Sequence, residues 1–140
     1  CQMQNVVEVH MRGVELGLSS PITSWLEAGA NYTWLDMDNV SNPAIRITNV
    51  PSQKLTANVL LRPMAQVEVV GYLEHDSDQW ASNTVKLDGF TTANLKAVYR
   101  PAKNLYAEIG VNNLADKNYS LADGFPNPGR TYFATANYQF

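Results

Sequence analysis

Hydrophobic and polar residues alternate along most of this chain, in segments of about ten residues separated by polar breaks. In the segment 25–36, Leu26, Ala28 and Ala30 alternate with Glu27 and Asn31. A period of two places the two sets on opposite faces of a β-strand. The same alternation recurs in segments 54–62, 66–74, 92–100, 104–112 and 130–140. The pattern predicts two-faced strands and leaves no room for amphipathic helices.

The first segment, 7–18, changes its alternation partway along. Met11 is apolar at an odd position, whereas Val14 and Leu16 are apolar at even positions beyond Gly13. One extra residue would return both sets to one face, which is the effect of a β-bulge. We therefore expect a bulge near Arg12–Gly13, which would place Met11 on the apolar face and His10 on the polar face.

The breaks between segments alternate between short and long. Short ones contain Pro21, Pro63 and Pro101, while the long ones at 36–51, 76–89 and 112–129 are rich in Asn, Asp, Ser, Gly and Pro. Strands of this length suit a bilayer crossing, which takes about 9–11 tilted residues. Short turns on one side and long loops on the other are typical of bacterial outer-membrane barrels. The predicted fold is therefore all-β: an antiparallel, up-and-down transmembrane barrel wall of about seven strands.

Aromatic residues lie near the ends of the apolar faces, where a membrane interface favours amphipathic rings. They are Tyr32, Trp34, Tyr99, Tyr138 and Phe140. The opposite faces carry charges that need water or ionic partners. These charged residues are Lys54, Arg62, Glu68, Glu74, Lys96, Arg100, Glu108 and Arg130.

Two other folds fit the same alternation. A soluble β-sandwich or small β-barrel binding module would use the apolar faces as its own core. A self-contained barrel of eight strands would need an additional strand at 44–50 containing Ile45 and Ile47. Bacterial single-chain barrels have even strand numbers. An odd count of seven therefore leads us to expect that residues 1–140 are part of a larger barrel.

Composition changes this interpretation little. The net charge of −3 and pI near 5.2 disfavour a nucleic-acid partner. Hydrophobic residues make up 45% of the chain, and the mean hydropathy of −0.25 fits a barrel because lipid contacts only alternate residues. Cys1 is the single cysteine, so no disulfide or cysteine-rich zinc site is expected within the chain.

The sequence contains no recognisable catalytic constellation. His10 and His75 are the two histidines, and neither belongs to a nucleophile or zinc-protease motif. Met3, Met11 and Met37 are soft ligands, but Met11 and His10 are expected to point in opposite directions. The acidic loop residues lack an EF-hand pattern. We expect no enzyme activity, no cofactor and no metal site.

Aromatic and basic side chains in the long loops are candidate ligand contacts. Trp80 and Tyr119 either line a ligand vestibule or pack loops together, and Arg130 either contacts ligand or ties the last loop to the wall.

Several motifs, in this order, resemble the C-terminal barrel segment of TonB-dependent outer-membrane receptors. They are Gly-Val-Glu-Leu at 13–16, Asn-Val-Pro at 49–51, Val-Asn-Asn-Leu-Ala-Asp-Lys-Asn-Tyr at 111–119, Gly-Phe-Pro-Asn-Pro-Gly-Arg-Thr-Tyr at 124–132, and the terminal Tyr138 and Phe140. The run 111–119 is similar to the family's NNLxDKxY motif. The likeness covers essentially the whole chain.

This resemblance implies a wall of a barrel of about 22 strands that holds an N-terminal plug in the Gram-negative outer membrane. It implies uptake of a scarce nutrient, such as a ferric siderophore, cobalamin, haem or copper, driven by the inner-membrane TonB complex. Tyr138 and Phe140 would form the signal for the barrel-assembly machinery, and outer-membrane lipid would surround the wall. The plug and the TonB box are expected outside residues 1–140, which would form about the last third of the barrel.

Overall fold

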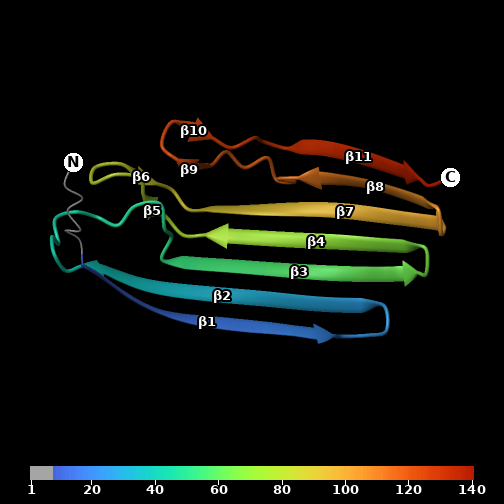
Figure 1. Cartoon of the computed structure of the whole chain (residues 1–140), viewed down its shortest axis with the longest axis horizontal. Coiled ribbons are helices and arrows are strands. Elements are labelled where there is room, and N and C mark those ends of the chain that lie inside the picture. Colours follow the sequence, from blue (N-terminus) through green and yellow to red (C-terminus); the bar gives the residue numbers. More distant parts are fainter. Residues whose placement is uncertain (1–7) are drawn as a thin grey trace.

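The computed structural model describes residues 8–140 and contains one sheet of seven strands. The strands are β1 (Val9–Pro21), β2 (Leu26–Asn39), β3 (Gln53–Met64), β4 (Val67–Asp76), β7 (Phe90–Ala102), β8 (Leu105–Asn112) and β11 (Thr131–Tyr138). Each pairs antiparallel with its neighbours in chain order, as Figure 1 shows. The predicted up-and-down arrangement of seven strands is confirmed.

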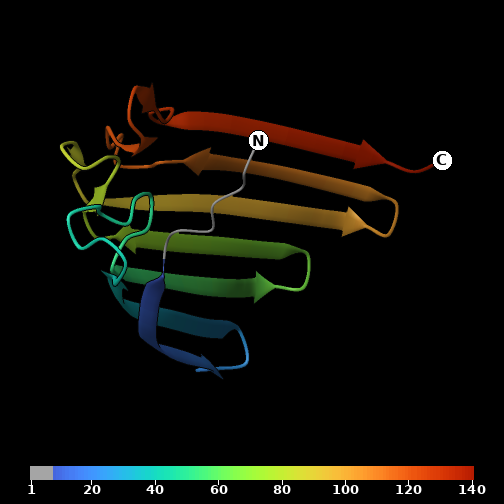
Figure 2. The same ribbon diagram turned by 60° about the vertical axis from the view of Figure 1, so that its left-hand side comes forward.

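Short turns and long connections lie at opposite ends of this sheet (Figure 1). The turns after β1, β3 and β7 lie at the same end as the C-terminus, and Figure 2 shows the same division from a second angle. The long connections contain two small hairpins that the alternation did not predict. They consist of β5 (Gln79–Trp80) with β6 (Lys86–Leu87), and β9 (Ser120–Ala122) with β10 (Phe125–Pro126).

One face of the sheet is apolar across all seven strands. Register places Leu16 beside Tyr32, Tyr32 beside Leu55, and Ile109 beside Ala134. Large side chains on this face are open: Leu16 is 62% exposed, Ile109 64% and Tyr132 76%. Trp34 and Tyr132 lie toward the long connections, while Tyr99 and Tyr138 lie toward the short turns. The predicted aromatic borders of the apolar face are therefore present.

No second sheet packs on this face within residues 8–140. Phe90 and Val98 are the buried hydrophobic residues in that range, and both small hairpins belong to the loop end. A β-sandwich needs two facing sheets that share a core. The structure therefore does not support the soluble sandwich. Residues 8–140 also include no helix that is long and apolar enough to cross a membrane.

The predicted bulge at Arg12–Gly13 is wrong. The β1–β2 ladder runs without interruption from Val9 opposite Asn39 to Pro21 opposite Glu27. His10 therefore lies on the same face as Val14, and Met11 lies on the opposite face, the reverse of the expected assignment.

The alternation changes because β1 and β2 both extend past the edge of the apolar face at the same level. Arg12 lies opposite Asp36, two positions beyond the Val14–Trp34 pair, and its Nη2 donates to Asp36 Oδ2 at 2.9 Å. The outer face thus becomes ionic at this level in both strands. Glycine at position 13 avoids a steric clash. A Cβ there would lie 2.6 Å from Leu35 Cδ2, closer than van der Waals contact allows.

The irregular pairings of the large sheet occur at prolines near the short turns. Register shifts between Leu61 and Met64 around Pro63, and between Tyr99 and Ala102 around Pro101. Proline has no N–H to donate to the ladder, so pairing is interrupted there. Segment 44–50 forms no strand, so the eight-strand alternative lacks its additional strand. Cys1 and Met3 lie outside the described residues.

Candidate functional site

The three long connections, 40–52, 77–89 and 113–130, gather at one end of the sheet (Figures 1 and 2). A hollow of about 610 Å³ opens between the end of β2, connection 40–52 and the β5–β6 hairpin. Its apolar lining consists of Leu35, Met37, Val40, Pro43, Ile45, Ile47, Val50 and Trp80. Its charged lining consists of Asp36, Asp38, Arg46, Asp78 and Lys86. The volume is in the range of small-molecule sites, and the lining combines apolar surface with charged groups that can orient a ligand.

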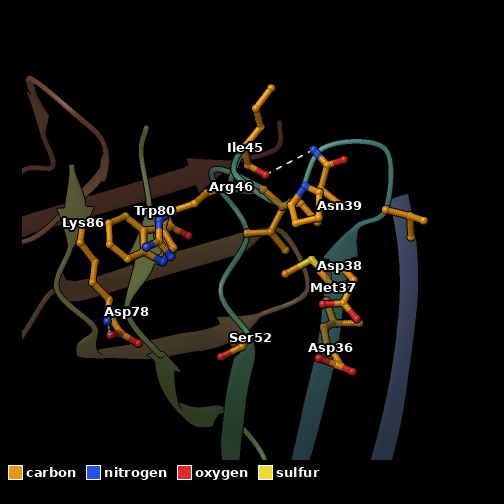
Figure 3. A pocket seen from close by; sticks show the side chains of 16 residues that line it. Asp36, Met37, Asp38, Asn39, Ile45, Arg46, Ser52, Asp78, Trp80 and Lys86 are labelled. Atoms are coloured by element: carbon orange, nitrogen blue, oxygen red, sulfur yellow. Dashed lines mark hydrogen bonds and ion pairs between the residues drawn. The ribbon is translucent and has the colours of Figure 1, made fainter. Parts of the chain in front are cut away.

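Trp80, one of the predicted ligand contacts, lines this hollow. Figure 3 shows Trp80, Lys86 and Asp78 on one side and the β2 residues on the other. The Arg46 guanidinium carbon lies 3.7 Å from the centre of the Trp80 ring, and Lys86 Nζ lies 5.6 Å from it. Both are within the range of cation–π attraction. Lys86 also forms an ion pair with Asp78.

Backbone and amide hydrogen bonds join the connections to one another. The Asn49 N–H donates to the Trp80 carbonyl at 2.7 Å, and the Arg46 N–H donates to Asn83 Oδ1 at 2.8 Å. Gln79 Nε2 donates to the Leu121 carbonyl at 3.0 Å, which joins the second connection to the third. These contacts hold Arg46 and Trp80 together from two separate loops. Arg46 is not among the predicted ligand contacts, because a lone arginine in a polar loop has no distinguishing pattern.

Tyr119 and Arg130 make contacts within the last connection. The Tyr119 ring stacks on buried Phe90, with ring centres 4.2 Å apart. Arg130 Nε donates to the Leu114 carbonyl at 2.9 Å, and the Arg130 N–H donates to Asp116 Oδ1 at 2.8 Å. Both partners belong to the same connection, so Arg130 joins the end of this loop to its beginning; a tie to the wall stays a prediction. Ligand contact by Tyr119 and Arg130 stays a prediction.

Asn113 organises the same connection. It is 4% exposed and adopts φ 53°, a left-handed conformation that Asn tolerates better than most residues. Its Nδ2 donates to the carbonyls of Lys117 at 2.8 Å and Pro128 at 3.3 Å, and its Oδ1 accepts from the Lys117 N–H at 2.9 Å. The NNLxDKxY-like run is thus a structural junction in this loop.

The polar face below the loops holds cross-strand ion pairs. Lys54 Nζ lies 3.2 Å from Glu74 Oε1 and 3.7 Å from Asp76 Oδ1. Arg62 and Lys96 make equivalent pairs with carboxylates on neighbouring strands. These are Arg62 with Glu27 at 2.9 Å and with Glu68 at 3.4 Å, and Lys96 with Glu108 at 3.7 Å. Six of the charges predicted for this face are therefore paired with one another, whereas Arg100 lies over the Tyr106 ring and Arg130 binds in the last connection.

The soft-ligand residues do not converge on one point. His10 Nε2 lies 3.0 Å from Glu8 Oε1 on the outer face, whereas Met11 and Met37 are paired on the opposite face. Within residues 8–140, no group of three or more His, Cys, Asp or Glu side chains is arranged to hold a metal ion.

Comparison with known proteins identifies the family of this chain. Residues 1–114 match the family model described as TonB dependent receptor-like, beta-barrel. The chain is 30% identical over 137 residues to the vitamin B12 transporter BtuB of Photobacterium profundum, covering 97% of this chain and 22% of that protein. It is 26% identical over 132 residues to the probable TonB-dependent siderophore receptor PiuA of Acinetobacter baumannii, covering 82% of this chain and 18% of PiuA.

Solved structures share the fold of this chain. The crystal structure of PiuA from Acinetobacter baumannii superposes with a TM-score of 0.82 at 24% identity, covering 96% of this chain and 22% of that one. The copper transporter OprC superposes with a TM-score of 0.80 at 22% identity, covering 96% and 24%. The chain thus spans about a fifth of the length of these relatives. It belongs to the β-barrel family of TonB-dependent receptors.

Proposed function

We propose that this chain is part of the wall of an outer-membrane receptor that imports a scarce nutrient and is not an enzyme. The continuous apolar face, bordered by Trp34 and Tyr132 at one edge and by Tyr99 and Tyr138 at the other, carries this proposal. A strand surface of this kind is stable when lipid covers it. Membership of the receptor family supports the same assignment.

Residues 1–140 would form about the last third of a barrel of about 22 strands. The plug and the TonB box would belong to other parts of the receptor. Two relatives of which this chain covers 22% are named as a vitamin B12 transporter and a siderophore receptor, which supports a whole receptor of greater length. Import would be driven through the inner-membrane TonB complex.

The C-terminal aromatic pair would serve barrel assembly. The Tyr138 and Phe140 rings meet edge to face with centres 5.1 Å apart, and Phe140 is fully exposed beyond β11. An exposed aromatic end on an edge strand is accessible to a protein that adds a strand or inserts the barrel. We propose that the barrel-assembly machinery recognises this pair.

The hollow at Trp80 would contribute to nutrient capture on the cell surface, with Tyr119 and Arg130 as further contacts in the last loop. The nutrient classes considered are ferric siderophores, cobalamin, haem and copper. Relatives named for vitamin B12, siderophore and copper transport support this range without selecting within it.

Deletion of the full-length receptor from its host, followed by complementation, tests this function. We expect the receptor in the outer-membrane fraction, and accumulation of at least one labelled probe only when both receptor and TonB are present. The probes are ferric tricatecholate, ferric citrate, ferric trihydroxamate, ferric haem, cyanocobalamin and Cu(II). Recovery in the soluble fraction, or equal accumulation of every probe without the receptor, would contradict the proposal.

A further inference from the structure

We propose that the Arg46 guanidinium, held against Trp80, binds an anionic oxygen group of the nutrient, so that this receptor imports an anionic chelate in preference to a neutral one. This inference rests on the proposed function. It begins with the position of Arg46, which lines the hollow and is exposed, while Trp80 is half-buried beneath it (Figure 3).

The stacked geometry leaves one part of the guanidinium available. With its central carbon 3.7 Å from the Trp80 ring centre, one flat side of the group is covered by the indole. A guanidinium carries its five N–H donors in the plane of the group, so stacking leaves them free to point sideways. Such a fork matches the paired oxygens of a carboxylate or another oxyanion.

The charges around Trp80 single out Arg46 as the group that lacks an anion. Lys86 also lies over the ring, but Asp78 neutralises it. Asp36, on the far side of the hollow, is paired with Arg12. Among the ion pairs formed by residues 8–140, none involves Arg46. Asp38, on the β2 side of the hollow, also lies outside these ion pairs. The unpaired positive charge is therefore on the Trp80 side, and a ligand anion would bind there, away from Asp38.

Arg46 is also positioned before any ligand arrives. Its backbone N–H is fixed by Asn83 Oδ1 at 2.8 Å, and the Trp80 carbonyl is fixed by the Asn49 N–H at 2.7 Å. A side chain already held in its binding geometry loses less conformational entropy when ligand binds. Beyond the guanidinium, Met37, Ile45 and Val50 offer apolar surface. The site therefore suits a chelate with an anionic oxygen group and an apolar portion.

The test uses the full-length receptor in cells and the same labelled probes. Ferric tricatecholate and ferric citrate are anionic, whereas ferric trihydroxamate and cyanocobalamin are neutral overall. We expect the unmodified receptor to accumulate an anionic probe. Arg46→Gln should weaken binding of that anionic probe to the receptor by about tenfold or more, since a charge-assisted bidentate contact is lost. Arg46→Lys keeps the charge but loses the planar fork, so its affinity for the anionic probe should lie between those of the unmodified receptor and Arg46→Gln.

Arg100→Gln is the matched control. Arg100 also lies over an aromatic ring, with its guanidinium carbon 5.2 Å from the centre of the Tyr106 ring, but it is at the short-turn end of β7 and outside the hollow. Cells that carry this control variant should accumulate as much anionic probe as cells that carry the unmodified receptor. The amount of receptor in the outer membrane is quantified for each variant. If Arg46→Gln fails to reach the outer membrane, Arg46→Lys replaces it in the test, and a several-fold loss of anionic-probe binding by Arg46→Lys supports the role of Arg46.

Three results would overturn the inference. Preference for a neutral probe, or an anionic probe bound equally by the unmodified receptor and both Arg46 variants, would refute the role of Arg46 while leaving the import function intact. Failure of every probe to accumulate would refute the import function together with it.

Discussion

At the scale of single residues, Asn113 has the strongest predicted effect on the loop end. Asn113→Ala removes three hydrogen bonds that the buried Asn113 side chain makes to the backbone of Lys117 and Pro128. Alanine also tolerates the φ of 53° less well. We expect a loss of about 2–4 kcal/mol in local stability.

Limited proteolysis of the full-length receptor in detergent measures this loss, because cleavage within 113–130 should become faster. Asn118→Ala is the control, since Asn118 lies in the same connection but is exposed and its side chain makes none of these bonds. Equal cleavage rates for both variants would show that Asn113 does not hold the loop.

The sequence allowed the roles of some residues to be anticipated better than those of others. The polar-face charges were predictable because an alternating strand assigns each side chain to one face. The partners of Trp80 and Arg130 were not, because loop contacts such as Arg46 over Trp80 depend on how separate connections fold together. Periodicity carries no information about residues outside the strands.

At the scale of the strand, adjacent positions should respond oppositely to the same substitution. Ala134 lies on the apolar face, while Thr135 lies on the polar face opposite Glu108. Ala134→Arg should destabilise the barrel by about 2–4 kcal/mol, the cost of an arginine near mid-membrane. Thr135→Arg should cost far less, because water and the Glu108 carboxylate can accept its charge.

Thermal unfolding of the purified receptor, and the amount of each variant assembled in the outer membrane, measure this difference. The paired design separates lipid exposure from a general intolerance of bulk in β11. If both variants were tolerated equally, the apolar face would not contact lipid.

The wrong bulge prediction shows that a change in alternation near the end of a strand can mark the edge of the apolar face. A change of phase along β1, considered alone, indicates an inserted residue. The structure shows β2 changing phase at the same level, because Asp36 follows Trp34 on one face just as Arg12 precedes Val14. A bulge affects one strand of a pair, whereas a membrane boundary affects both. Comparing partner strands, which requires the register, distinguishes the two cases.

At the scale of the whole molecule, strand order was predictable and loop structure was not. Seven segments joined by alternating short and long breaks permit simple neighbour pairing, which the sheet adopts. The hairpins β5–β6 and β9–β10 contain strands of two or three residues, too short for a period to be recognised. Of the residues that line the hollow beside β5 and β6, the main candidate site, the sequence therefore pointed only to Trp80 as a ligand contact.

The same architecture predicts how residues 1–140 behave when they are produced alone. β1 and β11 each form an edge of the seven-stranded sheet, and the apolar face has no covering layer within residues 8–140. Unpaired edges and a broad exposed apolar surface both favour association in water. We expect this segment to sediment as aggregates without detergent, whereas the full-length receptor in detergent should remain dispersed. Size-exclusion chromatography and analytical ultracentrifugation measure the outcome. A soluble monomer of 15.5 kDa would instead require the apolar faces to form a core of their own, as in a sandwich.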